Sequence, residues 1–96
     1  MIELSGAARP TRRRPKIKIP AAKRKAYRLI RSYTSQMRDD ILAGGAAYND
    51  EMYQIAMTYP DYTDSQFYQL ERSQAMDLFG YVKNLYDQFV NDNSGY

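Results

Sequence analysis

The chain has 96 residues, a formal net charge of +3 and neither cysteine nor histidine. This length allows a single domain. Without cysteine the chain has no disulfide or thiolate ligand, and without histidine it lacks the commonest general base and transition-metal ligand. These absences exclude the usual metal and thiol chemistries. We therefore expect a binding or structural protein that is not an enzyme and needs no cofactor.

Two kinds of membrane-related segment are missing from the sequence. No apolar run approaches the roughly 20 residues needed to span a bilayer. Residues 1–10 contain no apolar signal core. We therefore expect a cytoplasmic or virion-interior protein that is not secreted through a signal peptide.

Charge is divided unevenly along the chain. Residues 1–38 contain 12 of the 14 lysines and arginines but a single acidic residue, Glu3. Residues 39–96 contain only Arg72 and Lys83 against 10 acidic residues. Such segregation predicts a partner of opposite charge for at least one half. The alternative is that the two halves, or two copies of the chain, neutralise each other.

Residues 1–20 are predicted to form an extended basic arm. They show no helical period, and Pro10, Pro15 and Pro20 each fix their own backbone and push the preceding residue out of the helical region. The segment 16–19 alternates lysine with isoleucine and could add an edge strand to another protein. In isolation we expect the arm to be disordered.

Residues 21–96 are predicted to form a small helical domain, so the fold class is all-α with three helices. The first helix should cover about 21–43, because a pair of glycines follows it. The second should cover about 46–58 and end before Pro60. The third should cover about 64–91 and be the longest.

Each predicted helix carries apolar residues at helical spacing. In the first helix they are Ala26, Ile30, Tyr33, Met37 and Ile41. In the second they are Tyr48, Met52, Ile55, Ala56 and Tyr59. The third has two adjoining stripes, one formed by Ala75, Phe79, Val82, Tyr86 and Val90, the other by Phe67, Leu78, Tyr81, Leu85 and Phe89. The two shorter helices cannot cover both stripes, which predicts a second partner such as another copy. Gly80 predicts a bend or a close helix approach.

The strongest functional signal is the density of arginine and lysine between Arg9 and Arg38. The candidate residues for binding a polyanion or an acidic partner are Arg9, Arg12, Arg13, Arg14, Lys16, Lys18, Lys23, Arg24, Lys25, Arg28 and Arg31. Arginine suits bidentate contact with phosphate. No zinc finger, RNP signature or recognition helix accompanies the block, so sequence-specific reading of bases is not expected. Phosphates of DNA or RNA and an acidic protein groove both explain these residues.

The charges on the first predicted helix oppose its macrodipole at both ends. Five cations, from Lys23 to Arg31, crowd the N-terminal half, and Asp39 and Asp40 lie near the C-terminal end. Each such charge costs about 0.3–1 kcal/mol when it is exposed. The pattern predicts an anion close to the cationic end.

Ten tyrosines form the second unusual feature. A tyrosine ring buries a large area and keeps a polar tip, which suits partly hydrated interfaces. Core packing is expected for Tyr33, Tyr48, Tyr59, Tyr81 and Tyr86. The predicted interface residues are Tyr53, Tyr62, Tyr68, Phe79, Tyr86 and Phe89.

Two other activities receive little support. The acidic pairs Asp39–Asp40 and Asp50–Glu51 do not converge on a point, because adjacent helical residues project about 100° apart, and no catalytic or calcium-binding motif is present. A basic amphipathic helix can lie on an anionic membrane, but the first helix has moderate apolar bulk and the chain has no tryptophan.

These observations favour a non-enzymatic structural subunit of a larger assembly, most concretely a small component of a phage or virus particle. The basic arm and the tyrosine-rich faces would contact other protein subunits, of the same or a different chain. The alternative is a sequence-independent nucleic-acid-binding protein, DNA- or ribosome-associated, that uses the block Arg9–Arg38 on phosphates.

Overall fold

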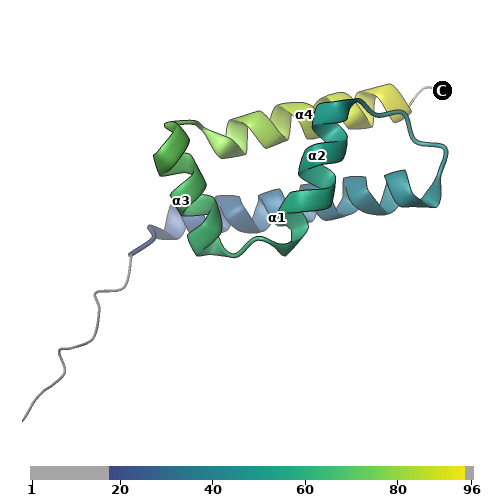
Figure 1. Cartoon of the computed structure of the whole chain (residues 1–96). Helices are drawn as coiled ribbons and strands as arrows, with labels where there is room; N and C mark the ends of the chain where they lie inside the picture. The colour runs from purple at the N-terminus through teal and green to yellow at the C-terminus, as the bar shows by residue number, and fades with distance from the viewer. Residues whose placement is uncertain (1–17, 95–96) are drawn as a thin grey trace, which may run out of the picture.

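The computed structural model describes residues 18–94, and within them every regular element is a helix. The predicted all-α class is therefore confirmed for this part of the chain, whereas residues 1–17, most of the predicted arm, lie outside it. None of the described helices is long and apolar enough to cross a membrane. The elements are α1 (Ala21–Ala43), α2 (Asp50–Thr58), the short 3-10 helix η2 (Tyr59–Asp61), α3 (Asp64–Gln74) and α4 (Leu78–Asn93) (Figure 1).

The two longest helices, α1 and α4, lie side by side and run in the same direction, and α2, η2 and α3 connect them (Figure 1). Because α1 and α4 are parallel, their C-terminal ends meet at one end of the molecule. There the side chain of Asn93 accepts the N–H of Ala47 at 2.6 Å and donates to the Ala47 carbonyl at 2.9 Å. We call this end, residues 39–49 and 90–94, the loop end.

One hydrophobic core lies between α1 and the helices packed on it. Its buried apolar members are Tyr27, Ile30, Met37, Ile41, Met52, Ile55, Ala56, Phe67, Leu78, Val82, Leu85 and Phe89. The stripe predicted on α1 is correct at three positions, but Tyr27 and Thr34 complete it, while Ala26 and Tyr33 are only partly buried. Thr34 can be buried because its hydroxyl donates to the Ile30 carbonyl at 2.7 Å.

The first helix has the predicted bounds, but the predicted start of the second helix at residue 46 is wrong. Two glycines with φ of 90° and 87°, values that favour glycine, end α1 and begin a loop. The loop continues until Asn49, whose side chain accepts the N–H of Met52 at 2.8 Å and caps the new helix. As a result α2 begins at Asp50 and ends at Thr58, its predicted end.

The single long helix predicted over residues 64–91 is also wrong, because the chain turns between α3 and α4. Ala75 adopts the left-handed conformation with φ of 50° and ends α3. The N–H of Met76 then donates to the Glu71 carbonyl at 3.2 Å, which satisfies a group that the helix end leaves free. The chain therefore has four α-helices in its described part, and α1, with 23 residues, is the longest.

The bend predicted at Gly80 is found a few residues earlier. Asp77 is the N-cap of α4, and its carboxylate accepts the N–H of Gly80 at 3.2 Å. The turn lays α4 against α1, so the chain itself buries most of one predicted stripe, namely Leu78, Leu85 and Phe89, together with Val82 of the other. The expectation that these positions need a second partner is thus incorrect, although Val90 remains exposed.

Candidate interaction surfaces

Three of the six cations on α1 are bound by carboxylates of the chain itself. Lys23 lies 3.2 Å from Glu71, and Arg31 lies 2.8 Å from Asp64. Arg38 approaches Asp61 at 4.0 Å. The two charge halves of the sequence therefore neutralise each other in part. This pairing corrects the view that the whole basic block faces an outside partner, because Lys23 and Arg31 serve the fold.

Glu71 is the most enclosed charged group among the described residues, with 6% of its surface exposed. Its carboxylate accepts hydrogen bonds from the buried Tyr27 hydroxyl, from Lys23 at 3.3 Å and from the N–H of Leu78 at 3.1 Å. Burial, followed by the hydrogen bond to Glu71, raises the pKa of Tyr27. The sequence offered no signal that Glu71 is a buried hydrogen-bond acceptor, because the apolar pattern predicts a continuous helix through the turn that follows it.

Arg31 joins α1 to the start of α3. Besides its ion pair with Asp64, its guanidinium donates to the Tyr62 carbonyl at 3.2 Å and lies 5.8 Å from the ring centre of Phe67. A planar group that makes directed hydrogen bonds and a stacking contact is held in one orientation. Arg31 is therefore a structural residue.

The other cations at the start of α1 are exposed, and we call Lys18, Arg24, Lys25 and Arg28 the cationic face. Arg24 and Arg28 are four residues apart and Lys25 lies three before Arg28, so the helix places them on one side. Arg24 donates to the Ile19 carbonyl at 2.7 Å. Within residues 18–94 none of the four has a carboxylate partner, so this surface presents uncompensated positive charge. The remaining predicted site residues, Arg9, Arg12, Arg13, Arg14 and Lys16, lie outside the described residues.

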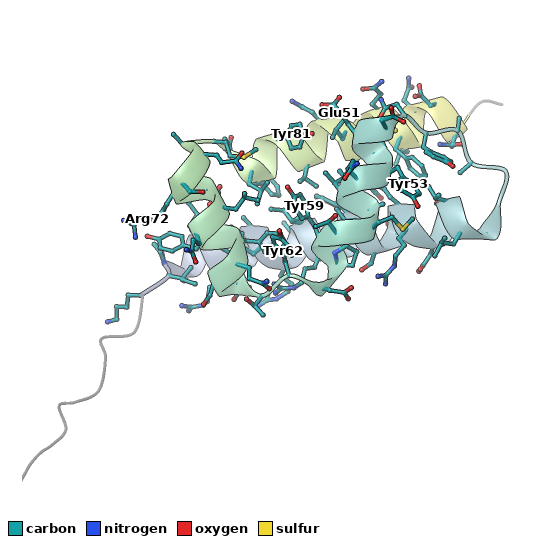
Figure 2. All side chains as sticks on the ribbon, in the orientation of Figure 1. Glu51, Tyr53, Tyr59, Tyr62, Arg72 and Tyr81 are labelled. Carbon is teal, nitrogen blue, oxygen red and sulfur yellow. The ribbon has the colours of Figure 1, made fainter. Side chains whose placement is uncertain are left out.

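Arg72 adds a further cation beside the cationic face. It extends outward from the last turn of α3 (Figure 2). Its guanidinium lies 5.8 Å from the ring centre of Tyr68. Both residues line an open surface hollow of about 350 Å³ that also includes Lys23 of α1. We call this end of the molecule, residues 18–28 and 72–77, the turn end.

That hollow is an unconvincing ligand site. It is lined by Lys23, Tyr68, Glu71, Arg72, Ala75, Met76 and Asp77. Its two carboxylates are already engaged, since Glu71 binds Tyr27 and Leu78 while Asp77 caps α4. The part of the chain that the structure describes also contains no group of three acidic residues that could hold a metal ion.

Most of the predicted interface aromatics pack partly inside the molecule. Tyr62 lies against Phe67 with ring centres 5.2 Å apart, and Figure 2 shows it beside Tyr59 between α2 and α3. Tyr86 of α4 stacks on Tyr33 of α1, with ring centres 4.4 Å apart.

The other predicted interface residues are buried to different extents. Phe79 packs against Tyr33, with ring centres 6.4 Å apart, and Tyr68 is partly buried. Phe89 is only 2% exposed and belongs to the core, so it offers no surface to a partner. Of the six predicted interface residues, Tyr53 presents the most exposed ring.

The loop end carries or borders four exposed apolar side chains. Leu42 is 68% exposed, Tyr48 49%, and Tyr53 and Val90 45% each. The rings of Tyr48 and Tyr53 stack at 5.9 Å. Tyr48 therefore does not join the core as predicted. Leu42 was not identified from the sequence as a surface residue, because it lies off the apolar stripe of α1. The available signal was an off-stripe leucine shortly before the glycine pair that ends the helix.

Acidic side chains accompany this apolar surface. Asp39 and Asp40 precede Leu42 on α1, Asp50 begins α2, and Asp92 lies near the end of α4. Within residues 18–94 these four carboxylates have no cationic partner, in contrast to Asp61, Asp64, Glu71 and Asp87. The described part of the molecule thus has a cationic turn end and an acidic, partly apolar loop end.

No known protein family, curated protein or solved structure matches the chain.

Proposed function

We propose that the chain is a non-enzymatic assembly subunit that docks on acidic protein surfaces through its cationic face. The observation that carries this proposal is the sorting of the cations on α1. Lys23 and Arg31 form ion pairs with Glu71 and Asp64 of the chain itself. Arg24, Lys25 and Arg28 instead remain exposed near the basic N-terminal segment of the sequence. Uncompensated charge of one sign on a small domain favours a partner of the opposite sign.

Helix α1 also loses stability by carrying this face. Its first turn contains no acidic residue and its last turn contains no basic residue. The exposed charges that lie there, such as Arg24 near the N-terminus and Asp40 near the C-terminus, have the sign that the macrodipole disfavours. Each misplaced charge costs about 0.3–1 kcal/mol. An anionic partner offsets that cost at the turn end, which makes the arrangement consistent with docking.

A protein partner is preferred over nucleic acid because aromatic and apolar side chains accompany the charges. Exposed Leu29 lies next to Arg28, and half-buried Tyr68 lies beside Arg72. Interfaces between proteins are enriched in tyrosine and arginine. Contact with phosphates would require only the charges.

The proposal is tested by comparing two anionic probes, a glutamate–tyrosine copolymer and duplex DNA, at an ionic strength of about 0.15 M. The unmodified chain should bind the copolymer more tightly than the DNA. Changing Arg24, Lys25 and Arg28 to alanine should weaken copolymer binding at least about tenfold. A control variant, Lys83→Ala, removes one cation from α4, far from the cationic face in sequence, and should bind as the unmodified chain does.

The alternative function, sequence-independent binding of nucleic acid, makes a different prediction. The affinity for DNA would then exceed that for the copolymer, and log K would fall with log salt at a slope of about −0.9 for each neutralised phosphate. Replacing Arg12, Arg13 and Arg14 with alanine would make that slope less steep. This result would replace the assembly function with the nucleic-acid one.

A further inference from the structure

The two ends of the molecule are complementary in charge and cannot meet within one copy. Arg28 and Asp39 lie on the same continuous helix, roughly 17 Å apart along its axis. The cationic face and the carboxylates of the loop end are therefore fixed at a distance by α1 itself. Their mutual attraction can be satisfied only between different molecules.

We propose that the loop end of one copy binds the turn end of a second copy, so that the chain associates head to tail. This inference rests on the proposed assembly function and names the partner. The docking surface is the exposed apolar group Leu42, Tyr48, Tyr53 and Val90. Exposed apolar groups with a polar rim mark protein interaction sites.

Charge complementarity selects the occupant of that surface. The exposed carboxylates of Asp39, Asp40, Asp50 and Asp92, which are close in sequence to these apolar residues, favour a cationic partner. The cationic face provides one, and exposed Leu29 provides an apolar contact at the same place. Arginine side chains also stack on tyrosine rings, which the exposed pair of Tyr48 and Tyr53 offers.

The chain's own N-terminal segment is a weaker candidate for this surface. Arg12 is six residues before Lys18, so covalent geometry limits it to about 22 Å from that residue. The loop end begins at Asp39, roughly 27 Å along the axis from the start of α1. The fully extended backbone from Lys18 to Arg12 is thus shorter than the separation to Asp39, which makes the chain's own three consecutive arginines less suited to this surface than the cationic face of a second copy.

A head-to-tail contact is heterologous, because different surfaces meet. Such a contact leaves one free loop end and one free turn end on every open oligomer. Association therefore continues with concentration, either to a closed ring or to a filament. A symmetric dimer built from two loop ends would instead bring like charges together.

The test uses two charge-reversed full-length variants. Asp39→Lys with Asp40→Lys replaces two carboxylates at the loop end with cations, and Arg24→Glu with Arg28→Glu replaces two cations at the turn end with carboxylates. Both pairs move α1 toward the charge distribution that its macrodipole favours, so each variant should fold at least as well as the unmodified chain. Circular dichroism verifies the helix content, and sedimentation velocity measures association at about 50 mM salt.

We expect the unmodified chain to form oligomers whose size increases with concentration and falls as salt rises. Each variant alone should be monomeric, and an equimolar mixture of the two should associate again, because each supplies the end that the other has lost. A further variant, Asp39→Asn with Asp40→Asn, removes two loop-end carboxylates and should associate less than the unmodified chain. Its matched control, Gln69→Lys with Asn84→Lys, changes the net charge by the same amount away from the loop end and should associate more strongly than that variant.

Three results would overturn the inference: an unmodified chain that stays monomeric, reversed variants that still associate alone, or a mixture that does not recover. These outcomes are separate from failure of the proposed function. A monomer that still binds the glutamate–tyrosine copolymer through Arg24, Lys25 and Arg28 keeps the assembly function and excludes self-association. A chain that does neither loses both.

Discussion

The hydroxyl of Tyr27 on α1 donates a hydrogen bond to the carboxylate of Glu71 on α3, and both groups are buried although they are 44 residues apart in sequence. The same carboxylate accepts the N–H of Leu78, the first residue of α4. One acidic side chain therefore connects three helices at the turn end. This arrangement positions the start of α1, and with it the cationic face.

Replacing Glu71 with alanine should lower the free energy of unfolding by about 2–3 kcal/mol, because it leaves both the buried Tyr27 hydroxyl and the N–H of Leu78 without their acceptor. Urea denaturation followed by circular dichroism measures this loss. As a comparison, Asp61→Ala removes a carboxylate that is 83% exposed and should cost less than about 0.5 kcal/mol. Equal losses in the two variants would show that Glu71 has no special role.

Stability should decrease in alkaline solution because of three tyrosines that are wholly or partly buried. Burial first, and then nearby groups, raises the pKa of Tyr27, Tyr59 and Tyr81. In the unfolded chain a tyrosine loses its proton near pH 10, whereas the folded chain keeps it to higher pH. The folded state then binds more protons, so its stability is full below about pH 10 and falls as pH rises beyond that value.

This alkaline effect can be assigned to one residue by substitution. Tyr27→Phe lacks the titrating hydroxyl and should reduce the slope of unfolding free energy against pH between about pH 10 and pH 11 by up to 1.4 kcal/mol per pH unit. Urea denaturation at several pH values gives that slope. Tyr53→Phe, which changes an exposed ring, should leave it unaltered. A slope that Tyr27→Phe does not change would mean that other groups cause the alkaline loss.

Ala75→Gly should stabilise the protein by about 0.5–1 kcal/mol. Ala75 has φ of 50°, a conformation that costs an L-residue with a Cβ atom about 1–2 kcal/mol and that glycine adopts freely. Thermal and urea unfolding measure the gain. If the chain instead continued as one helix through this position, the same glycine would destabilise it by about 1 kcal/mol.

Asp77→Ala examines the same turn from its other side. The substitution removes the carboxylate that caps α4 at the N–H of Gly80, and it should cost about 1 kcal/mol. In an uninterrupted helix, alanine would be the better residue at this position and the change would stabilise. A stabilising Ala75→Gly together with a destabilising Asp77→Ala is therefore expected only if the chain turns here, because an uninterrupted helix would reverse both signs.

The sequence predicted the elements whose signals are local and strong. The bounds of α1 follow from Pro20 and the two glycines after residue 43, and the end of α2 follows from Pro60. The α3–α4 turn was not predictable in this way, because the apolar spacing continues through it. Ala75 holds a left-handed conformation that glycine usually occupies, and the stabilising contact comes from Glu71 and its long-range partner Tyr27.

The sequence predicted which residues make up the basic block, but not which of them pair within the fold and which stay exposed. Density of arginine and lysine identified the block, whereas nothing in the sequence separates Arg31 from Arg28. The separation depends on where α3 begins, since Asp64 and Phe67 meet only one of the two guanidinium groups. Similarly, Tyr48 follows the helical spacing of α2 but lies in the loop before it, where its ring stays exposed.

Two arginines on one helix should therefore behave in opposite ways. Arg31→Ala removes the ion pair with Asp64, the bond to the Tyr62 carbonyl and the contact with Phe67, and should cost about 1–2 kcal/mol of stability. Arg28→Ala removes an exposed side chain and should stay within about 0.5 kcal/mol of the unmodified protein. Urea denaturation gives both values.

The relative effects of these two substitutions should be reversed in partner binding. Arg28→Ala should weaken binding of the glutamate–tyrosine copolymer, because Arg28 belongs to the exposed cationic face. Arg31→Ala, measured where it is fully folded, should bind the copolymer nearly as well as the unmodified chain, since its guanidinium is already occupied by Asp64. A copolymer affinity that falls equally in both variants would show that the partner responds to net charge alone, which would remove the distinction between structural and docking cations.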